Sequence, residues 1–161
     1  MQVFNRRRAG VVGLALALLS GGQAMAQPVS TADGVVRVRS AYTMQETVSR
    51  IRKDIADKGI LFFSELDQAK LAADAGIKLL PSTLLSFGNP PLGAQFLTSN
   101  PNAGLDWPVR VLVSQDAAGV VWAVYTDFSW IARRHQISDR AAQFATAAGV
   151  VESITASIKA R

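Results

Sequence analysis

His135 is the residue best suited to proton transfer in this chain, and little else in the sequence could do chemistry. The 161 residues include one histidine and no cysteine. This composition excludes disulfide scaffolds, thiolate metal sites and cysteine nucleophiles. A proton-transfer site would have to pair His135 with a carboxylate, and Asp127 and Asp106 are the candidates for an orienter or an acid. A small hydrolase or isomerase is therefore one hypothesis for the function.

Several polar, aromatic and glycine residues near the ends of predicted elements form a candidate ligand site. Its members are Gly88, Asn89, Asp106, Trp107, Asp127, Arg133, Arg134 and His135. Each polar member also has a structural role open to it. Asn89 and Asp127 stand where helix N-caps belong, and Asp106 could bridge to Arg110. The adjacent arginines could clamp an anion or oppose the negative end of a helix.

The sequence predicts no metal and no cofactor. A single histidine cannot supply two imidazole ligands, and Glu65, Asp67 and Asp74 are interpreted as a helix cap and solvated surface groups. The glycine that precedes Asn89 is not followed by a P-loop lysine, so a nucleotide site is not expected.

The first 26 residues have the pattern of a secretory signal. Three arginines at 6–8 precede an apolar run at 9–19, and Ala24-Met25-Ala26 follows. We expect cleavage after Ala26 and a periplasmic or secreted protein, by the general or the twin-arginine route. The alternative is an uncleaved anchor, but the apolar run is much shorter than the roughly 20 residues of a spanning helix. No stable membrane anchor is expected after cleavage.

Removing this leader changes the charge balance. The leader holds three of the 17 basic residues and none of the 12 acidic ones, so 14 minus 12 leaves a net charge near +2. The remaining lysines and arginines are not clustered, and nucleic acid is therefore not an expected partner.

Hydrophobic periodicity predicts the elements that must position these residues. Alternation at 36–39 indicates a strand, and the spacing of apolar residues over 44–58 indicates a helix whose start carries a capping box of Thr43 and Glu46. The further elements are a strand at 60–66, a short helix from Asp67 to near Gly76, a strand at 83–87, a helix at 90–98, a loop at 100–104, and a hairpin pairing 109–115 with 120–126.

Two more helices complete the chain. The first follows Asp127 and carries Arg133, Arg134 and His135 in its last turn. The second follows Ser138, with an apolar stripe of Phe144, Ala148, Val151, Ile154 and Ile158. The order of about five strands and several helices predicts one α+β domain over 33–161, after the leader at 1–26 and a short segment at 27–32.

The hairpin also predicts excess apolar surface. Its valines occupy one face, yet Leu112, Trp122 and Val124 make the opposite face apolar in part. Such a surface needs a cover, which could be a ligand, a second subunit or the terminal helix through Phe144. Internal cover and a homodimer both stay open.

Three sequence blocks resemble the domain of unknown function 302 family. They are Phe87-Gly88-Asn89-Pro90-Pro91-Leu92, the run from Gly104 through Asp106-Trp107-Pro108 to Val113, and Tyr125-Thr126-Asp127 with Ala132-Arg133-Arg134-His135. The resemblance covers about 35–137. It implies a curved antiparallel sheet with helices packed on one face, similar to the TATA-binding-protein type of fold, and brings no established activity. Many members carry a histidine where Gln68 stands and an acid where Gln115 stands, so the neutral residues here weaken an enzymatic interpretation.

Together these observations favour an exported, non-catalytic binding or interaction module. Its groove is expected between the 88–92 turn, Asp106-Trp107 and the helix that follows Asp127. A second copy of the chain, an unknown small molecule or an envelope protein are the partners we expect.

Overall fold

The computed structural model describes residues 30–160, so the predicted leader and its cleavage point lie outside the described residues. Five antiparallel strands form one sheet in the order β1-β5-β4-β3-β2. The elements are β1 (Val35–Arg39), α1 (Met44–Asp57), β2 (Leu61–Asp67), α2 (Gln68–Asp74), β3 (Ser82–Gly88), α3 (Pro90–Ser99), the 3₁₀ helix η1 (Pro101–Leu105), β4 (Val109–Gln115), β5 (Val121–Thr126), α4 (Phe128–Arg134) and α5 (Ala141–Ala156).

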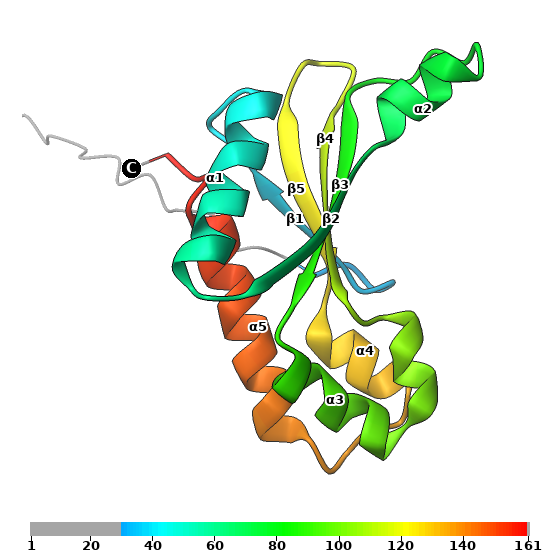
Figure 1. Cartoon of the computed structure of the whole chain (residues 1–161), viewed down its shortest axis with the longest axis vertical. Coiled ribbons are helices and arrows are strands. Elements are labelled where there is room, and N and C mark those ends of the chain that lie inside the picture. Colours follow the sequence, from blue (N-terminus) through cyan, green and yellow to red (C-terminus); the bar gives the residue numbers. More distant parts are fainter. Residues whose placement is uncertain (1–29, 161) are drawn as a thin grey trace, which may run out of the picture.

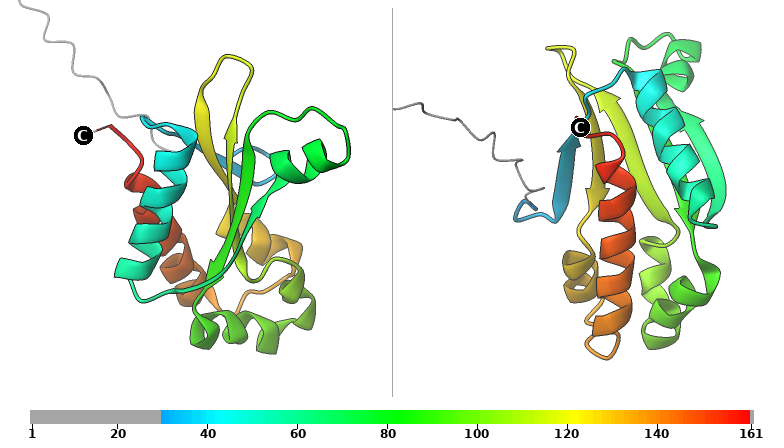
Figure 2. Two further views of the ribbon diagram at one scale, coloured as in Figure 1. Left: turned by 45° about the horizontal axis from the view of Figure 1, so that its top comes forward. Right: turned by 90° about the vertical axis from the view of Figure 1, so that its left-hand side faces the viewer.

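The helices divide into two groups around this sheet. The long helices α1 and α5 lie side by side against one face, and α3, η1 and α4 gather at one end of the sheet (Figures 1 and 2). At the other end, β2 and β3 extend away from the body and are joined through α2. The predicted α+β fold with a curved antiparallel sheet is confirmed. No helix within residues 30–160 has both the length and the apolar character needed to cross a membrane.

Alternation along β1, β3, β4 and β5 places one face of the sheet in the core. Leu85 and Phe87 on β3, and Val111 and Val113 on β4, are at most 1% exposed. They pack with buried residues of the helical layer, among them Ile51, Ile55, Val151 and Ile154. Burial of a branched or aromatic side chain contributes roughly 1.5–3 kcal/mol, so this face fixes the strand register.

The opposite face of the sheet is open. Strand register aligns Leu66, Leu84, Leu112 and Val124 in one row across four strands, and each of the four remains exposed or half-exposed. The terminal helix does not cover this row. Its Phe144 stacks on Phe96 in the helical layer, with ring centroids 4.3 Å apart. The internal cover considered from the sequence is therefore wrong, because α5 packs on the other face.

The helix caps follow the sequence closely. Thr43, Asp67, Asn89 and Asp127 each accept a backbone hydrogen bond at a helix start. The capping box is only half formed, because the Glu46 carboxylate accepts from Arg50 instead of returning to residue 43.

Two expectations about the last elements need correction. The 100–104 loop is helical, because the Asn100 side chain accepts from the Asn102 amide at 2.9 Å and Pro101 fits the first helical position. In α5, Ala147 and Thr155 are buried while Ala148 is half-buried. The buried stripe is thus rotated slightly from the predicted one.

The one-sided core predicts opposite outcomes for two neighbouring leucines. Leu85→Ala should lower the free energy of unfolding by about 2–5 kcal/mol, because Leu85 is fully buried and truncation leaves a cavity. Leu84→Ala should cost less than about 1 kcal/mol, because Leu84 lies on the open face. Urea unfolding measures both, and equal losses would contradict the one-sided core.

Candidate functional site

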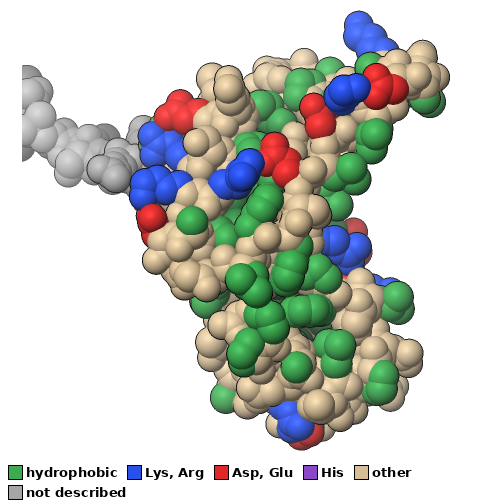
Figure 3. Space-filling view, in the orientation of Figure 1, with side chains coloured by type: hydrophobic (Ala, Val, Ile, Leu, Met, Phe, Trp, Pro, Cys, Tyr) green, Lys and Arg blue, Asp and Glu red, His purple; other side chains and the backbone are tan. Residues whose placement is uncertain are grey.

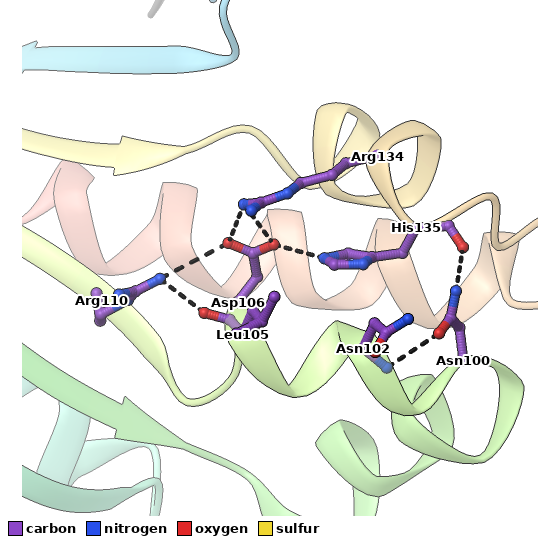
Figure 4. Close-up of polar contacts among 7 residues, drawn as sticks. All are labelled: Asn100, Asn102, Leu105, Asp106, Arg110, Arg134 and His135. Carbon is purple, nitrogen blue, oxygen red and sulfur yellow. Dashed lines mark hydrogen bonds and ion pairs between the residues drawn. The ribbon is translucent and has the colours of Figure 1, made fainter.

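A buried ion-pair cluster centred on Asp106 lies where η1, β4 and α4 meet. Figure 4 shows Arg134 and His135 reaching the Asp106 carboxylate from the end of α4, with Arg110 approaching from β4. The Arg134 Nη1 donates to both carboxylate oxygens at 3.2 and 3.1 Å. The His135 Nε2 lies 2.6 Å from Asp106 Oδ2, and the Arg110 Nη2 lies 3.6 Å from Oδ1.

Burial differs sharply between the members of this cluster. The side chains of Asp106 and His135 are each 5% exposed, whereas those of Arg110 and Arg134 are 50% and 43% exposed. The two guanidinium groups thus lie toward solvent and compensate the buried carboxylate. A buried carboxylate requires such partners, because an unpaired charge in the interior is strongly destabilising.

The cluster also fastens three chain segments to one another. Arg110 donates to the Leu105 carbonyl at 3.0 Å, and Asn100 donates from Nδ2 to the His135 carbonyl at 2.8 Å. His135 is therefore held both through its ring and through its backbone. These contacts link residues 28 to 35 positions apart, so the cluster holds η1 and the end of α4 together at this end of the sheet.

This geometry limits what His135 can do chemically. The ring nitrogen Nε2 already shares a hydrogen bond with Asp106, and the ring is almost completely enclosed. A general base needs a nitrogen within hydrogen-bond reach of a bound substrate. The arrangement therefore favours a structural role for His135 over proton transfer.

The expected convergence of three turns is present, but the space between them is small. Asn89, Asp106 and Trp107 line one cleft together with Phe128 and apolar neighbours from α3 and α5. Its volume is about 40 Å³, enough for only a few water molecules. A metabolite does not fit this cleft in its present form.

The structure separates the other predicted site residues from the Asp106 cluster. Asp127 caps the start of α4, whereas His135 is at its end, so the histidine pairs with Asp106 and not with Asp127. The Arg133 guanidinium donates to the Ser129 hydroxyl at 3.1 Å and takes no part in the cluster.

Asp127 is occupied by its capping role. Partial burial raises the pKa of its carboxyl, but hydrogen bonds from the Ser129 hydroxyl and the Trp130 amide, with smaller contributions beside them, outweigh burial and hold this pKa below its ordinary value. The cap is therefore ionised at neutral pH, next to the positive end of the α4 dipole. The hydrogen bonds of the cap occupy the Asp127 carboxylate, which a ligand would otherwise use as an acceptor.

Two glycines make room for the Trp107 indole. A Cβ added at Gly93 would lie 1.9 Å from the indole nitrogen, and one added at Gly88 would lie 3.3 Å from it. Phe63 approaches the same indole edge-on, with centroids 5.9 Å apart. Gly88 is thus a packing position, and sequence reasoning missed Gly93 and Phe63 because no local pattern marks them as neighbours of Trp107.

A second and larger groove lies at the base of the extended β2–α2–β3 segment. Its volume is about 420 Å³, within the range of small-molecule sites. Apolar side chains supply most of the exposed lining, and the polar residues include two carboxylates. The lining residues are Met44, Gln45, Val48, Glu65, Asp67, Ala69, Leu79, Pro81, Ser82 and Thr83. These residues come from four elements and a loop, so no local motif could have indicated the groove.

The acidic residues near this groove have structural partners. Glu65 pairs with Arg52 at 2.9 Å and Asp74 pairs with Lys70 at 2.6 Å, while Asp67 caps α2. In the part of the chain that the structure describes, no three His, Cys, Asp or Glu side chains are grouped so that they could hold a metal ion.

The two positions that depart from the family pattern also lie at this end of the sheet. The Gln68 side-chain oxygen accepts from the Ser82 hydroxyl at 2.7 Å, and the Gln115 backbone N–H donates to the Pro81 carbonyl at 2.9 Å. Both are remote from the Asp106 cluster, which lies at the α3–α4 end.

Comparisons with known proteins agree with this architecture. The family model "Domain of unknown function DUF302" matches residues 36–158, which confirms the resemblance seen in the three sequence blocks. A crystal structure of an uncharacterized conserved DUF302 protein from Bacillus stearothermophilus superposes with a TM-score of 0.72 at 16% identity, covering 78% of this chain and 98% of the other. This likeness shows the fold.

Curated relatives with higher identity carry a functional name. Proteins named fluoride-specific ion channel FluC 1 from Brucella suis biovar 1 (strain 1330) and Brucella abortus biovar 1 (strain 9-941) are 35% identical over 104 residues. The match covers 65% of this chain but only 41% and 38% of those relatives. The chain thus spans less than half the length of the curated relatives it matches.

Neutralising the buried carboxylate should destabilise the fold. Asp106→Asn should lower the free energy of unfolding by about 2–3 kcal/mol, because the buried His135 and the half-exposed Arg134 lose their charged partner. Asp57→Asn is the matched control and should cost less than about 0.5 kcal/mol, since Asp57 is 57% exposed and forms a surface ion pair with Lys53. Urea unfolding at neutral pH compares the stabilities of the two variants, and equal small losses would mean that the cluster does not stabilise the fold.

Proposed function

The chain belongs to the DUF302 family, and we propose that it serves as a non-catalytic binding and interaction module in the periplasm. The observation that supports this role is the contrast between the two ends of the sheet. The group best suited to acid–base chemistry, His135, is enclosed and engaged by Asp106. An open, mostly apolar groove of about 420 Å³ lies at the other end.

The groove suits a small ligand with an apolar body. Met44, Val48, Ala69, Leu79 and Pro81 supply apolar lining. Glu65 and Asp67 are the ionisable groups among its lining residues and no lining residue is cationic, so an anionic ligand would find no charged partner in this lining. We therefore propose a neutral or cationic amphiphilic molecule as the ligand class.

The alternative is a small hydrolase or isomerase that uses His135 with Asp106. Its support is the 2.6 Å contact between His135 Nε2 and the carboxylate, which is a geometry that orients a catalytic imidazole in many enzymes. The small adjoining cleft and the enclosed ring favour the binding role instead. A turnover activity abolished by His135→Ala would reverse this preference.

The channel function in the names of the Brucella relatives is not part of this proposal. The matched stretch covers at most 41% of those proteins, so their named activity need not reside in the part that resembles this chain.

The groove is testable with a neutral apolar dye. Nile red should bind saturably, and Ala69→Trp should weaken binding at least about fivefold, because the indole would fill the groove beside α2. Ala94→Trp adds the same side chain to an exposed position on α3 and should leave the affinity unchanged. Fluorescence titration gives the dissociation constants. Lack of saturable binding, or equal affinity in Ala69→Trp, would remove the groove as a ligand site.

Export is testable independently of any ligand. When the full chain is expressed in a bacterium, the protein in the periplasmic fraction should begin at Gln27, because the small residues Ala24 and Ala26 fit the signal-peptidase cleft. N-terminal sequencing of the fractionated protein determines this. Recovery of a chain that begins at Met1 in the cytoplasmic fraction would contradict the proposed location.

A further inference from the structure

The exposed large hydrophobic residues concentrate in one short stretch of the chain. Within the described residues, seven of the eight large hydrophobic side chains classed as exposed lie between 61 and 80, and the eighth is Leu105. The seven are Leu61, Phe63, Leu66, Leu71, Ile77, Leu79 and Leu80, between 44% and 62% exposed. We call them the arm patch, and residues 61–81 the arm. Isolated surface leucines are normal, but such a concentration is typical of an interface.

Beyond the start of β2, where Phe62 packs against the core and Phe63 against Trp107, the arm has little packing of its own. Neither β2 nor α2 contains a buried residue. A helix of seven residues is too short to be stable through propensity alone, and most helices depend on packing of one face. Figure 3 shows hydrophobic side chains on the underside of the arm and in the middle of the same view, with no element lying over them. The arm therefore presents the exposed apolar surface that is typical of a segment covered by a partner.

We propose that a second copy of this chain packs on the arm, with the two β2 edges facing each other across a two-fold axis. β2 is the outer strand of the sheet, and its outer edge pairs with no other strand within residues 30–160. An antiparallel edge is self-complementary under two-fold rotation, because each copy presents the same strand in the opposite direction. This inference names a partner for the interaction role proposed above and rests on that role.

The charge of the arm favours a copy of the same chain over a strongly charged partner. Residues 61–81 hold three acidic and two basic side chains, a balance of 2 minus 3, or −1. Two of the acidic groups are paired with cations, Glu65 with Arg52 and Asp74 with Lys70. Two arms can therefore approach with little repulsion, whereas nucleic acid or an anionic membrane would find no basic surface here.

The available area is consistent with a modest dimer interface. A fully buried Leu or Phe removes roughly 60–120 Å² from water, so seven half-exposed side chains supply roughly 200–400 Å² per copy. A standard interface uses roughly 500 Å² of apolar surface per partner. The arm patch therefore supplies less apolar area than a standard interface, so the expected association is weak. We expect a dissociation constant in the micromolar range.

Sedimentation velocity of the full chain over roughly 1–100 μM should show a monomer–dimer equilibrium. The double variant Leu66→Lys/Leu71→Lys places charges on the arm patch at exposed positions, so it should fold normally and raise the dissociation constant at least tenfold. Leu105→Lys makes the same change at the exposed leucine outside the arm and should leave the constant unchanged. All three proteins keep residues 1–29, so association through that segment would be equal in each.

The absence of cysteine in the natural chain permits a second, geometric test. Ser64 lies in the middle of β2, so Ser64→Cys should form a disulfide between copies under mild oxidation. Ala145→Cys, at an exposed position on α5, should not.

Three results would overturn the proposal: a monomer throughout the concentration range, an unchanged constant in the double variant, or equal weakening by Leu105→Lys. A monomer that binds neutral lipid vesicles through Leu66 and Leu71 would also overturn it, in favour of a lipid surface. None of these measurements depends on Nile red binding, so the dimer and the ligand groove can fail separately.

Discussion

Burial of one face of the sheet is the constraint on which the rest of the structure depends. Alternating residues on β1, β3, β4 and β5 point into a layer formed by α1 and α5, and this layer contains the most completely buried side chains. Because the side-chain period of a strand is two, the same alternation must leave the intervening residues on the other face. The open row from Leu66 to Val124 is thus a direct consequence of how the core is formed.

The Asp106 cluster solves a different problem at the α3–α4 end. Here η1, the start of β4 and the end of α4 come together, and the helix ends bring polar backbone groups that must be satisfied. One buried carboxylate with an imidazole and two guanidinium groups joins these segments, and Asn100 adds a bond to the His135 carbonyl. Residue types associated with catalysis therefore occur here in an arrangement that stabilises the fold.

Local patterns predicted most of the elements, because each depends on residues close in the sequence. The caps at Asn89 and Asp127 and the 109–126 hairpin follow from side-chain hydrogen bonds and strand alternation within a few positions. The site was less predictable. The pairing of His135 with Asp106 was one of two alternatives, and choosing it required knowing that the end of η1 lies against the end of α4, a contact between residues 29 positions apart. Gly93 could not be identified at all, since its role exists only against Trp107, which is distant in the sequence.

The two ends of the sheet therefore differ in physical character, and this difference bears on function. At the α3–α4 end, the polar groups of the Asp106 cluster are paired and the adjoining cleft is small, so the cleft itself offers little free energy for binding a partner. At the arm end, apolar side chains remain in contact with water, and covering them would release the hydrophobic free energy that folding of one chain leaves unused. Leu79 belongs both to the groove and to the arm patch, so the two proposed surfaces adjoin. A partner on one surface would therefore contact elements that shape the other, and any resulting coupling between the two must be reciprocal.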